Sequence, residues 1–348
     1  MRTSEVILGR TEIAVPKNGF GALPIQRIGR EEAAALLRKA YAGGIRFFDT
    51  ARFYTDSEEK IGYALEDVRD SIYLASKTMA ATPEDFKEQL ATTLQNLRTD
   101  VLDLYQFHNP SFCPKPGDGS GLYEAMLAAK AEGRIRHIGI TSHRIAIAEE
   151  AVASGLYDTL QYPFSYLATD REIALVHAAE TAGVGFIAMK ALSGGLLQNA
   201  RVAYAWMLQF PNVLPIWGIQ REGELMEFLS FARQTPDLDS DATALIQRDR
   251  DELAGQFCRG CGYCLPCPAG IEIPNAARMS LMIRRAPLSI YLNEDWQQKM
   301  EKIDECIDCG QCESRCPYGL KTRELLRNNL GDYRKQIALH KSQSGGIG

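Results

Sequence analysis

The sequence predicts an α/β protein in which eight strand–helix units precede a small, mainly helical and cysteine-rich domain. Three observations support this prediction. Between about residues 19 and 232, short β-branched or aromatic runs alternate with amphipathic stretches, the pattern of strand–helix units around a parallel sheet. Eight of the nine cysteines then lie between Cys258 and Cys316. The length of 348 residues suffices for one barrel with a small appendage, or for two ordinary domains.

The predicted strands are short apolar runs separated by helical patterns. They cover residues 18–23, 45–50, 71–77, 101–108, 136–141, 158–162, 184–190 and 213–218. One helical pattern begins with Thr82 as N-cap and Pro83 as first helical residue, and Asp85 completes the spacing of a capping box. Eight such units in about 215 residues favour a closed (β/α)8 TIM barrel, although a doubly wound open sheet has the same local pattern.

Composition divides the chain and excludes several classes of partner. We expect residues 1–233 to form the barrel, residues 234–255 a linker, and residues 256–348 the cysteine-rich domain with its tail. A formal net charge of −5 argues against nucleic acid, which requires a basic patch. The N-terminus lacks a signal-peptide core and no window approaches a membrane span. We therefore expect a cytoplasmic protein without a membrane partner, whose clustered cysteines bind metal rather than form disulfides.

Four reactive side chains follow three successive predicted strands. Asp49 and Tyr54 lie at or just after the end of the second strand, Lys77 ends the third and His108 ends the fourth. Active sites of such barrels form at the carboxyl ends of the strands, so these four residues are expected to meet at one rim. Each residue taken singly also has a structural role open to it, as a loop cap, a packed ring, a solvated lysine or a core histidine. Their joint placement favours a catalytic site.

These four side chains together suit proton transfer to a carbonyl oxygen. A tyrosine hydroxyl is a poor acid at neutral pH, because its reference pKa is about 10, but an adjacent ammonium such as that of Lys77 lowers this pKa. Asp49 would hold Lys77 by a charge-assisted hydrogen bond, and His108 would direct a donor at the substrate oxygen. Pro24, Gln26, Phe53 and Tyr166 are candidates for lining the substrate pocket.

The motifs FDTARFY, LASKT and LDLYQFH, which carry the four residues, resemble those of the aldo/keto reductase family. The resemblance extends from LGRTEIAVPKNGFGALP near the N-terminus to the eighth strand. It implies a (β/α)8 barrel that uses NADPH or NADH to reduce a small carbonyl substrate. It also implies that Tyr54 is the general acid or base and that Asp49, Lys77 and His108 complete a catalytic tetrad.

The same resemblance implies a dinucleotide site across the barrel mouth, where no GxGxxG motif follows the first strand. GITSH and LQY would contact the carboxamide, the glycine-rich MKALSGGLL the pyrophosphate, and GIQREGELMEF the adenosine. Arg221 favours a 2′-phosphate and hence NADPH, although a solvated arginine at a helix start is an equal alternative. Phe228 replaces the family's usual asparagine, which leaves NADH open. The expected contacts are Thr141, Ser142, Gln161, Lys190, Ser193, Gly194, Gln220, Arg221 and Glu224.

The eight clustered cysteines form two runs, CRGCGYCLPCP and CIDCGQCESRCP. The second has the spacing of bacterial ferredoxins and the first is one residue shorter, so we expect a ferredoxin-like domain with two 4Fe-4S clusters. Because the last cysteine of each run serves the other cluster, one ligand set is Cys258, Cys261, Cys264 and Cys316. The other ligand set is Cys267, Cys306, Cys309 and Cys312. A pair of four-thiolate zinc sites is the less favoured alternative, and Cys113 is left as a loop thiol.

Three functional hypotheses follow from these two constellations. The tetrad favours an NAD(P)H-dependent carbonyl reductase whose clusters are structural or redox-sensing. The eight cysteines support an alternative in which the clusters exchange electrons with ferredoxin or a flavin partner. That alternative lacks a converter between two-electron hydride and one-electron cluster chemistry. A nucleotide-sensing regulatory subunit is a third hypothesis, against which the intact tetrad argues. A subgroup of microbial aldo/keto reductases with a ferredoxin-like tail resembles nearly the whole chain.

Overall fold

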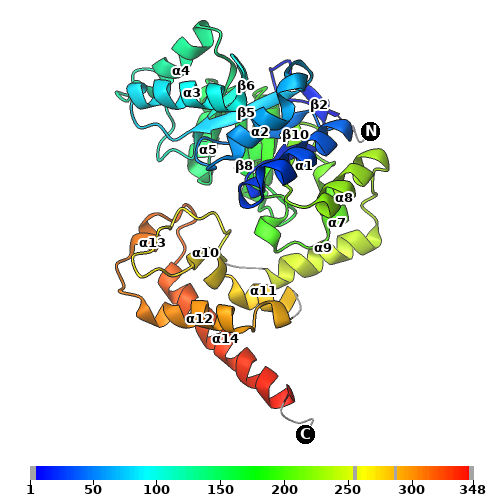
Figure 1. The fold of residues 1–348 in the computed structure, drawn as a ribbon, viewed down its shortest axis with the longest axis vertical. Coiled ribbons are helices and arrows are strands. Elements are labelled where there is room, and N and C mark those ends of the chain that lie inside the picture. The colour runs from blue at the N-terminus through cyan, green and yellow to red at the C-terminus, as the bar shows by residue number, and fades with distance from the viewer. Residues whose placement is uncertain (1–4, 254–256, 286–287, 345–348) are drawn as a thin grey trace. The chain divides into compact units, whose positions relative to one another are not determined.

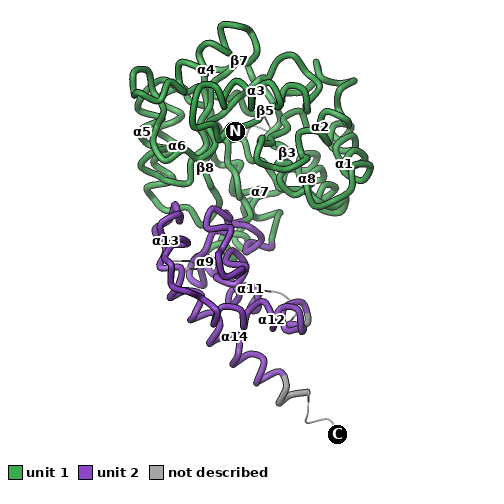
Figure 2. The backbone as a smooth tube through the Cα atoms, turned by 60° about the vertical axis from the view of Figure 1, so that its left-hand side comes forward, with its two compact units in different colours: residues 1–192, 199–247 green, residues 193–198, 248–348 purple. Residues whose placement is uncertain are grey.

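The computed structural model describes residues 5–253, 257–285 and 288–344. The chain divides into two compact units (Figure 2). The barrel unit consists of residues 1–192 and 199–247. The cysteine-rich unit consists of residues 248–348 together with residues 193–198, which follow the seventh barrel strand. A short segment within the barrel sequence therefore groups with the cysteine-rich unit.

Eight parallel strands close the barrel. In chain order they are β3 (Gly19–Gly21), β4 (Phe47–Asp49), β5 (Tyr73–Thr78), β6 (Leu102–His108), β7 (Ile135–Thr141), β8 (Thr159–Pro163), β9 (Gly185–Met189) and β10 (Val213–Gly218). Each strand pairs with the next, and β10 pairs with both β9 and β3. This last pairing distinguishes a closed barrel from an open sheet and confirms the predicted TIM-type fold.

Helices alternate with these strands along the chain (Figure 1). They are α1 (Arg30–Ala42), α2 (Ser57–Leu65), α3 (Pro83–Leu97), α4 (Leu122–Ala131), α5 (Ile145–Ser154), α6 (Asp170–Thr181), α7 (Ala200–Met207), α8 (Glu222–Arg233) and α9 (Ser240–Glu252). Thr82 caps α3 as expected, its Oγ1 accepting from the Asp85 N–H at 3.2 Å. The second hydrogen bond of the expected capping box, from the Thr82 N–H to the Asp85 side chain, is not formed. Asp85 Oδ2 accepts from the Ala81 N–H instead. Helix α9 lies in the stretch that we expected to be a linker.

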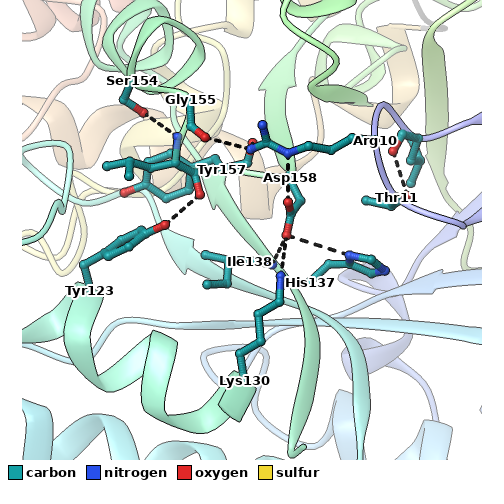
Figure 3. A network of polar contacts seen from close by, with 12 residues as sticks. Arg10, Thr11, Tyr123, Lys130, His137, Ile138, Ser154, Gly155, Tyr157 and Asp158 are labelled. Atoms are coloured by element: carbon teal, nitrogen blue, oxygen red, sulfur yellow. Dashed lines mark hydrogen bonds and ion pairs between the residues drawn. The ribbon is translucent and has the colours of Figure 1, made fainter.

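A hairpin of β1 (Glu5–Ile7) and β2 (Ala14–Pro16) packs on the barrel core through buried apolar side chains. Its turn is anchored beside the starts of β8 and β9, where the Arg10 N–H donates to Gly183 O at 2.7 Å. The Arg10 side chain donates to Asp158 Oδ1 at 3.0 Å, and Asp158 Oδ2 accepts from the Ile138 N–H at 2.9 Å (Figure 3). These contacts lie at the amino ends of the strands, opposite the rim where the expected active site falls.

The cysteine-rich unit is helical in its described regular elements, which confirms the prediction of a mainly α domain. Its helices are α10 (Ile273–Ala276), α11 (Met279–Arg285), α12 (Glu294–Glu301), α13 (Gln311–Ser314) and α14 (Thr322–Ser344). Met279, Met300 and Tyr333 are fully buried at the centre of its small core. In the described part of the chain, no helix is both long and apolar enough to cross a membrane.

Candidate active site and cysteine site

The four tetrad residues lie at one rim of the barrel. Asp49 is the last residue of β4, Lys77 is next to last in β5, and His108 ends β6. Strand register places Lys77 opposite Gln106 of β6. Tyr54 follows β4 in a tight turn, where its N–H donates to Ala51 O at 2.9 Å. The structure therefore brings together side chains separated by up to 59 positions in the sequence, since 108 − 49 = 59.

Asp49 and Lys77 form a buried ion pair. Lys77 Nζ donates to Asp49 Oδ2 at 2.6 Å and to Thr50 O at 2.6 Å, and the two side chains are 1% and 3% exposed. Burial raises the pKa of Asp49 and lowers the pKa of Lys77, while each partner opposes the shift of the other. Amides from Gln106 and Gln161 also approach the carboxylate at 3.4 Å. Removal of either partner would leave a buried charge uncompensated.

The Tyr54 ring is the point on which the other side chains converge. Lys77 Nζ lies 5.2 Å from the ring centroid, within the range of a cation–π contact. The His108 ring meets it edge-on with centroids 5.7 Å apart at an interplanar angle of 86°. Phe53, which is 65% exposed, also contacts the His108 ring, with centroids 6.3 Å apart. The arrangement places a cation and an imidazole beside one phenol.

His108 is held neutral by its surroundings. Burial, with further contributions from the charges of Lys77 and Lys190, lowers its pKa to about 3. Among the described residues, its buried Nδ1 has no hydrogen-bond partner. A buried polar atom without a partner is a feature that a bound polar group would satisfy. The histidine is thus suited to exchange a neutral hydrogen bond with a substrate oxygen.

We predict that His108 makes the barrel sensitive to acid. Its folded-state pKa lies below the reference value of 6.5, so the unfolded chain binds the proton more readily. The stability that His108 contributes is therefore present above about pH 6.5 and is lost as the pH falls towards 3. His108→Gln should reduce the dependence of the unfolding free energy on pH by up to about 1.4 kcal/mol per pH unit. Urea unfolding between pH 5 and 7 measures this slope, and equal slopes for both proteins would contradict the prediction.

Two buried residues near the tetrad were missed in the sequence. Glu58 on α2 is 1% exposed and accepts from Ser76 Oγ at 2.7 Å and from Thr93 Oγ1 at 2.8 Å. It pairs with Arg52, and its charge also favours the ammonium form of Lys77 by raising that residue's pKa. His143 is 4% exposed, and its N–H donates to Asn109 Oδ1 at 3.0 Å. An acidic residue in the first turn of a helix is usually solvent-exposed, so no local sequence pattern predicted that Glu58 is buried.

The residues expected to contact the nicotinamide end of a dinucleotide are buried at the same rim. Thr141 ends β7, and its Oγ1 accepts from the Asn109 N–H at 3.1 Å. Ser142 Oγ is engaged with the Arg144 backbone at 3.0 Å. The side-chain Oε1 of Gln161 accepts from Gln106 Nε2 at 3.0 Å, and Gln161 Nε2 contacts Asp49. Gln161 therefore belongs to the hydrogen-bond network of the tetrad.

The remaining expected contacts fall into two groups. Glu224 closes the start of α8, where its Oε2 accepts from the N–H groups of Gln220 and Arg221 at 2.8 and 3.0 Å. Lys190 follows β9 in the barrel unit with a φ of 56°. Ser193 and Gly194 fall in the cysteine-rich unit, and Gly194 adopts a φ of 67° that favours glycine. Lys190 thus belongs to the barrel unit, whereas Ser193 and Gly194 of the same glycine-rich motif belong to the cysteine-rich unit.

The eight clustered cysteines lie in the cysteine-rich unit, and five of them line a cavity. All nine cysteines of the chain are described, and none forms a disulfide. The cavity is partly open to solvent and is lined by cysteines of both runs. These are Cys264, Cys267, Cys306, Cys309 and Cys312. The cavity thus contains the complete set that we assigned to one cluster, and the thiols suit iron.

The other expected set is also gathered. Burial raises the pKa of Cys258, and the nearby thiols of Cys261 and Cys316 raise it further. The Gly260 N–H donates to Cys258 Sγ at 3.4 Å, the kind of bond that tunes a cluster. Within the described residues, no group of three or more His, Cys, Asp or Glu side chains is close enough to hold a single metal ion. The four thiols of the second set instead line one cavity, and four thiolates are the ligand set of a 4Fe-4S cluster.

The closed barrel and the buried Asp–Lys pair beside Tyr and His define the class of barrel oxidoreductases. Residues 17–203 match the model of the Aldo/keto reductase family, and the chain belongs to this family. Residues 257–321 match the model of a 4Fe-4S dicluster domain. Both resemblances inferred from the motifs are thereby confirmed.

Individual relatives match the barrel part of the chain. Aldo-keto reductase str7 of Strobilurus tenacellus is 32% identical over 53% of this chain and 60% of its own length. Methylglyoxal reductase DkgB of Salmonella typhi is 32% identical over 41% of this chain and 53% of its own. The chain thus spans only a little over half the length of these curated relatives.

Solved structures show the same fold. A thermostable aldo-keto reductase in complex with the inhibitor epalrestat is 26% identical with a TM-score of 0.60, over 71% of this chain and 100% of its own. An aldo-keto reductase from Klebsiella pneumoniae in complex with NADPH has a TM-score of 0.61 at 23% identity, over 71% of this chain and 95% of its own. The latter supports the fold alone.

Proposed function

We propose that this protein is an NAD(P)H-dependent oxidoreductase that reduces an aldehyde or ketone to an alcohol. The observation that carries the proposal is the convergence of the Lys77 ammonium and the His108 ring on Tyr54, at 5.2 and 5.7 Å from its ring centroid. Proton transfer by a positioned side chain requires a donor whose pKa is tuned towards neutrality. A buried ammonium beside a phenol meets that requirement.

Each tetrad residue at the rim has a separate role in the protonation of the carbonyl oxygen. Bound NADPH would supply the hydride that reaches the carbonyl carbon. Tyr54 gives its hydroxyl proton to the carbonyl oxygen, and the Lys77 ammonium stabilises the phenolate that remains. Asp49 keeps Lys77 charged and in place through the bond at 2.6 Å. Neutral His108 donates a hydrogen bond to the same oxygen and so orients the substrate.

The dinucleotide contacts and the substrate class belong to the same proposal. Thr141, Ser142 and Gln161 would receive the carboxamide at the tetrad rim, and Lys190, Ser193 and Gly194 the pyrophosphate. Gln220, Arg221 and Glu224 would contact the adenosine end, with Arg221 favouring NADPH. Methylglyoxal is a suitable first substrate to assay, because one relative is a methylglyoxal reductase. We place the protein in the cytoplasm, where thiols stay reduced.

We further propose that the cysteine-rich unit holds two 4Fe-4S clusters. Cys258, Cys261, Cys264 and Cys316 would bind the first cluster. Cys267, Cys306, Cys309 and Cys312 would bind the second cluster. The cavity lined by all four residues of the second set supports this assignment, as does the mutual proximity of Cys258, Cys261 and Cys316.

The ligand assignment predicts the iron content of single variants. Wild-type protein purified without oxygen should contain about eight iron atoms per chain. Cys261→Ser and Cys309→Ser should each lower this to about four, because each removes a ligand from a different cluster. Cys113→Ser should leave it unchanged, since Cys113 is buried in the barrel unit beside Tyr157. A full complement of iron in both cluster variants would refute the assignment.

A second function, electron exchange with ferredoxin or a flavin partner, is favoured by one observation. Cys309 is exposed, and Ile307, two positions before it, is 66% exposed, so a partner could approach the second cluster closely. A hydride carries two electrons and a cluster accepts one, so electron exchange would require a further group that passes the electrons on one at a time. The carbonyl reductase is therefore the function that the site supports best.

One experiment separates the two functions. NADPH is added without oxygen to the cluster-loaded protein, and the cluster absorbance band and the electron paramagnetic resonance spectrum are recorded with and without methylglyoxal. Oxidised clusters that stay unchanged while methylglyoxal consumes NADPH would support the carbonyl reductase. Bleaching of the band with a reduced-cluster signal would support electron transfer instead.

A further inference from the structure

Arg278 is a buried cation that the proposed mechanism does not use. Arg278 lies between α10 and α11 along the chain and is only 8% exposed. Nε donates to Pro274 O at 2.8 Å and Nη2 to Asn275 Oδ1 at 3.1 Å, which fixes the plane of the guanidinium. Nη1 donates to Gly194 O at 2.9 Å. One arginine thus reaches from the helices of the cysteine-rich unit to the 193–198 segment of the same unit.

The guanidinium packs against two glycine turns. A Cβ at Gly260, within the first cysteine run, would lie 2.9 Å from Arg278 Cζ. A Cβ at Gly194 would lie 2.8 Å from Arg278 Nη1 and 3.4 Å from Arg259 O. Both glycines have positive φ, 64° and 67°. The absence of side chains at both positions lets the backbone of the cysteine run and that of the 193–198 segment approach the guanidinium closely.

Two of the three groups that favour the charged form of Arg278, Cys258 and Cys261, are expected ligands of the first cluster. Burial lowers the pKa of Arg278, and Cys258, Tyr291 and Cys261 oppose this shift by favouring the charged form. A buried cation is costly unless a negative group compensates it. A thiolate-bound cluster on Cys258 and Cys261 is such a group. The position of the guanidinium, and with it the bond to Gly194 O, therefore depends on what the first cysteine run holds.

We propose that Arg278 is a positioning residue through which the first cluster fixes the 193–198 segment for dinucleotide binding. With the cluster present, the anionic charge holds the guanidinium in its buried site, and Nη1 orders the backbone at Gly194. Without the cluster, the guanidinium moves towards solvent and the segment loses this anchor. The coupling to the dinucleotide rests on the proposed function, because it assigns the glycine turn of this segment to the pyrophosphate.

The first test follows the segment itself and needs no dinucleotide. Hydrogen–deuterium exchange of peptides covering residues 193–198 is measured on cluster-loaded wild type, Arg278→Gln and Arg284→Gln. Arg284 on α11 is the control, because its side chain is 67% exposed and pairs with Asp332 at 3.7 Å. We expect exchange in the segment to rise at least about fivefold in Arg278→Gln and to stay unchanged in Arg284→Gln. Unchanged exchange in Arg278→Gln with its iron intact would overturn the proposal.

The dependence on the first cluster is tested with the two cysteine variants. Cys261→Ser, which removes the first cluster, should raise exchange in the segment as Arg278→Gln does. Cys309→Ser, which removes only the second cluster, should not. Equal effects of the two variants would show a general loosening of the unit and would refute the specific role of Arg278. If Arg278→Gln fails to assemble clusters, Arg278→Lys keeps the charge without the forked donors and should still raise exchange.

The second test measures NADP⁺ affinity by tryptophan fluorescence on the same loaded proteins. Arg278→Gln should raise the dissociation constant at least about fivefold, and Arg284→Gln should leave it unchanged. If wild type does not bind NADP⁺, the proposed function fails, whereas the exchange experiment still decides the role of Arg278. If wild type and Arg278→Gln bind NADP⁺ equally, the segment does not carry the coupling and the proposal is wrong.

Discussion

Replacing Tyr54 with Phe should lower the turnover of NADPH-dependent aldehyde reduction by about 10²- to 10⁴-fold, the range that positioned proton transfer contributes. The ring, and with it the contacts to Lys77 and His108 at 5.2 and 5.7 Å, remains in this variant. Only the proton donor is lost. Turnover with saturating methylglyoxal and NADPH measures the effect, and the dissociation constant for NADPH should change little.

Tyr63→Phe provides the matched control for this experiment. Its hydroxyl donates to Glu31 Oε1 at 3.0 Å on the outer surface of the barrel, so the variant should retain the turnover of wild type. Full activity of Tyr54→Phe would contradict the proposal that the protein is a carbonyl reductase. It would favour the hypothesis that the barrel is a nucleotide-sensing subunit, because such a subunit needs no proton donor.

Replacing Lys77 with Met should cost about 3–5 kcal/mol of unfolding free energy, because the removal of one partner leaves the buried Asp49 charge unpaired. The pair is almost fully buried, with side chains 1% and 3% exposed. Turnover should also fall, since the phenolate of Tyr54 loses its cation. Urea unfolding of the cluster-loaded protein, followed by tryptophan fluorescence, measures the first effect, and aldehyde reduction measures the second.

Two further variants isolate the contribution of the buried charge. Adding Asp49→Asn to Lys77→Met should recover part of the lost stability, because the uncompensated charge is removed, but it should not recover turnover. Lys39→Met removes an exposed pair with Glu222, in which the side chains are 45% and 64% exposed, and should cost less than about 1 kcal/mol. A cost for Lys77→Met as small as that for Lys39→Met would contradict the buried ion pair.

Much of the barrel and its site could be predicted because the signals are local. Alternating apolar runs mark strands and helices, and residues at the ends of successive parallel strands necessarily share one rim. Asp49, Lys77 and His108 were therefore located by their positions in the pattern alone. The cysteine runs are equally local, because thiolate spacing within a few residues determines how a chain can wrap a cluster.

Other features depend on contacts between distant segments and had no local signal. Closure of the sheet rests on the pairing of β10 with β3 across the whole chain, which periodicity does not distinguish from an open sheet. The position of Glu58 in the first turn of a helix suggests a solvent-exposed side chain. In the structure it is buried and accepts hydrogen bonds from Ser76 and Thr93. The low pKa of His108 follows mainly from burial, which residue order does not reveal.

The sequence by itself determined the fold class, the family, the tetrad positions and the two ferredoxin-type cysteine runs, because each is a matter of residue type at fixed spacing. Only the tertiary structure decided that the barrel closes, that Gln161 joins the tetrad network and that the 193–198 segment packs with the cysteine-rich unit. The physical reason is the same in each case. These features are made by contacts between residues far apart in the chain, such as the bond from Arg278 to Gly194 O, and no local pattern encodes them.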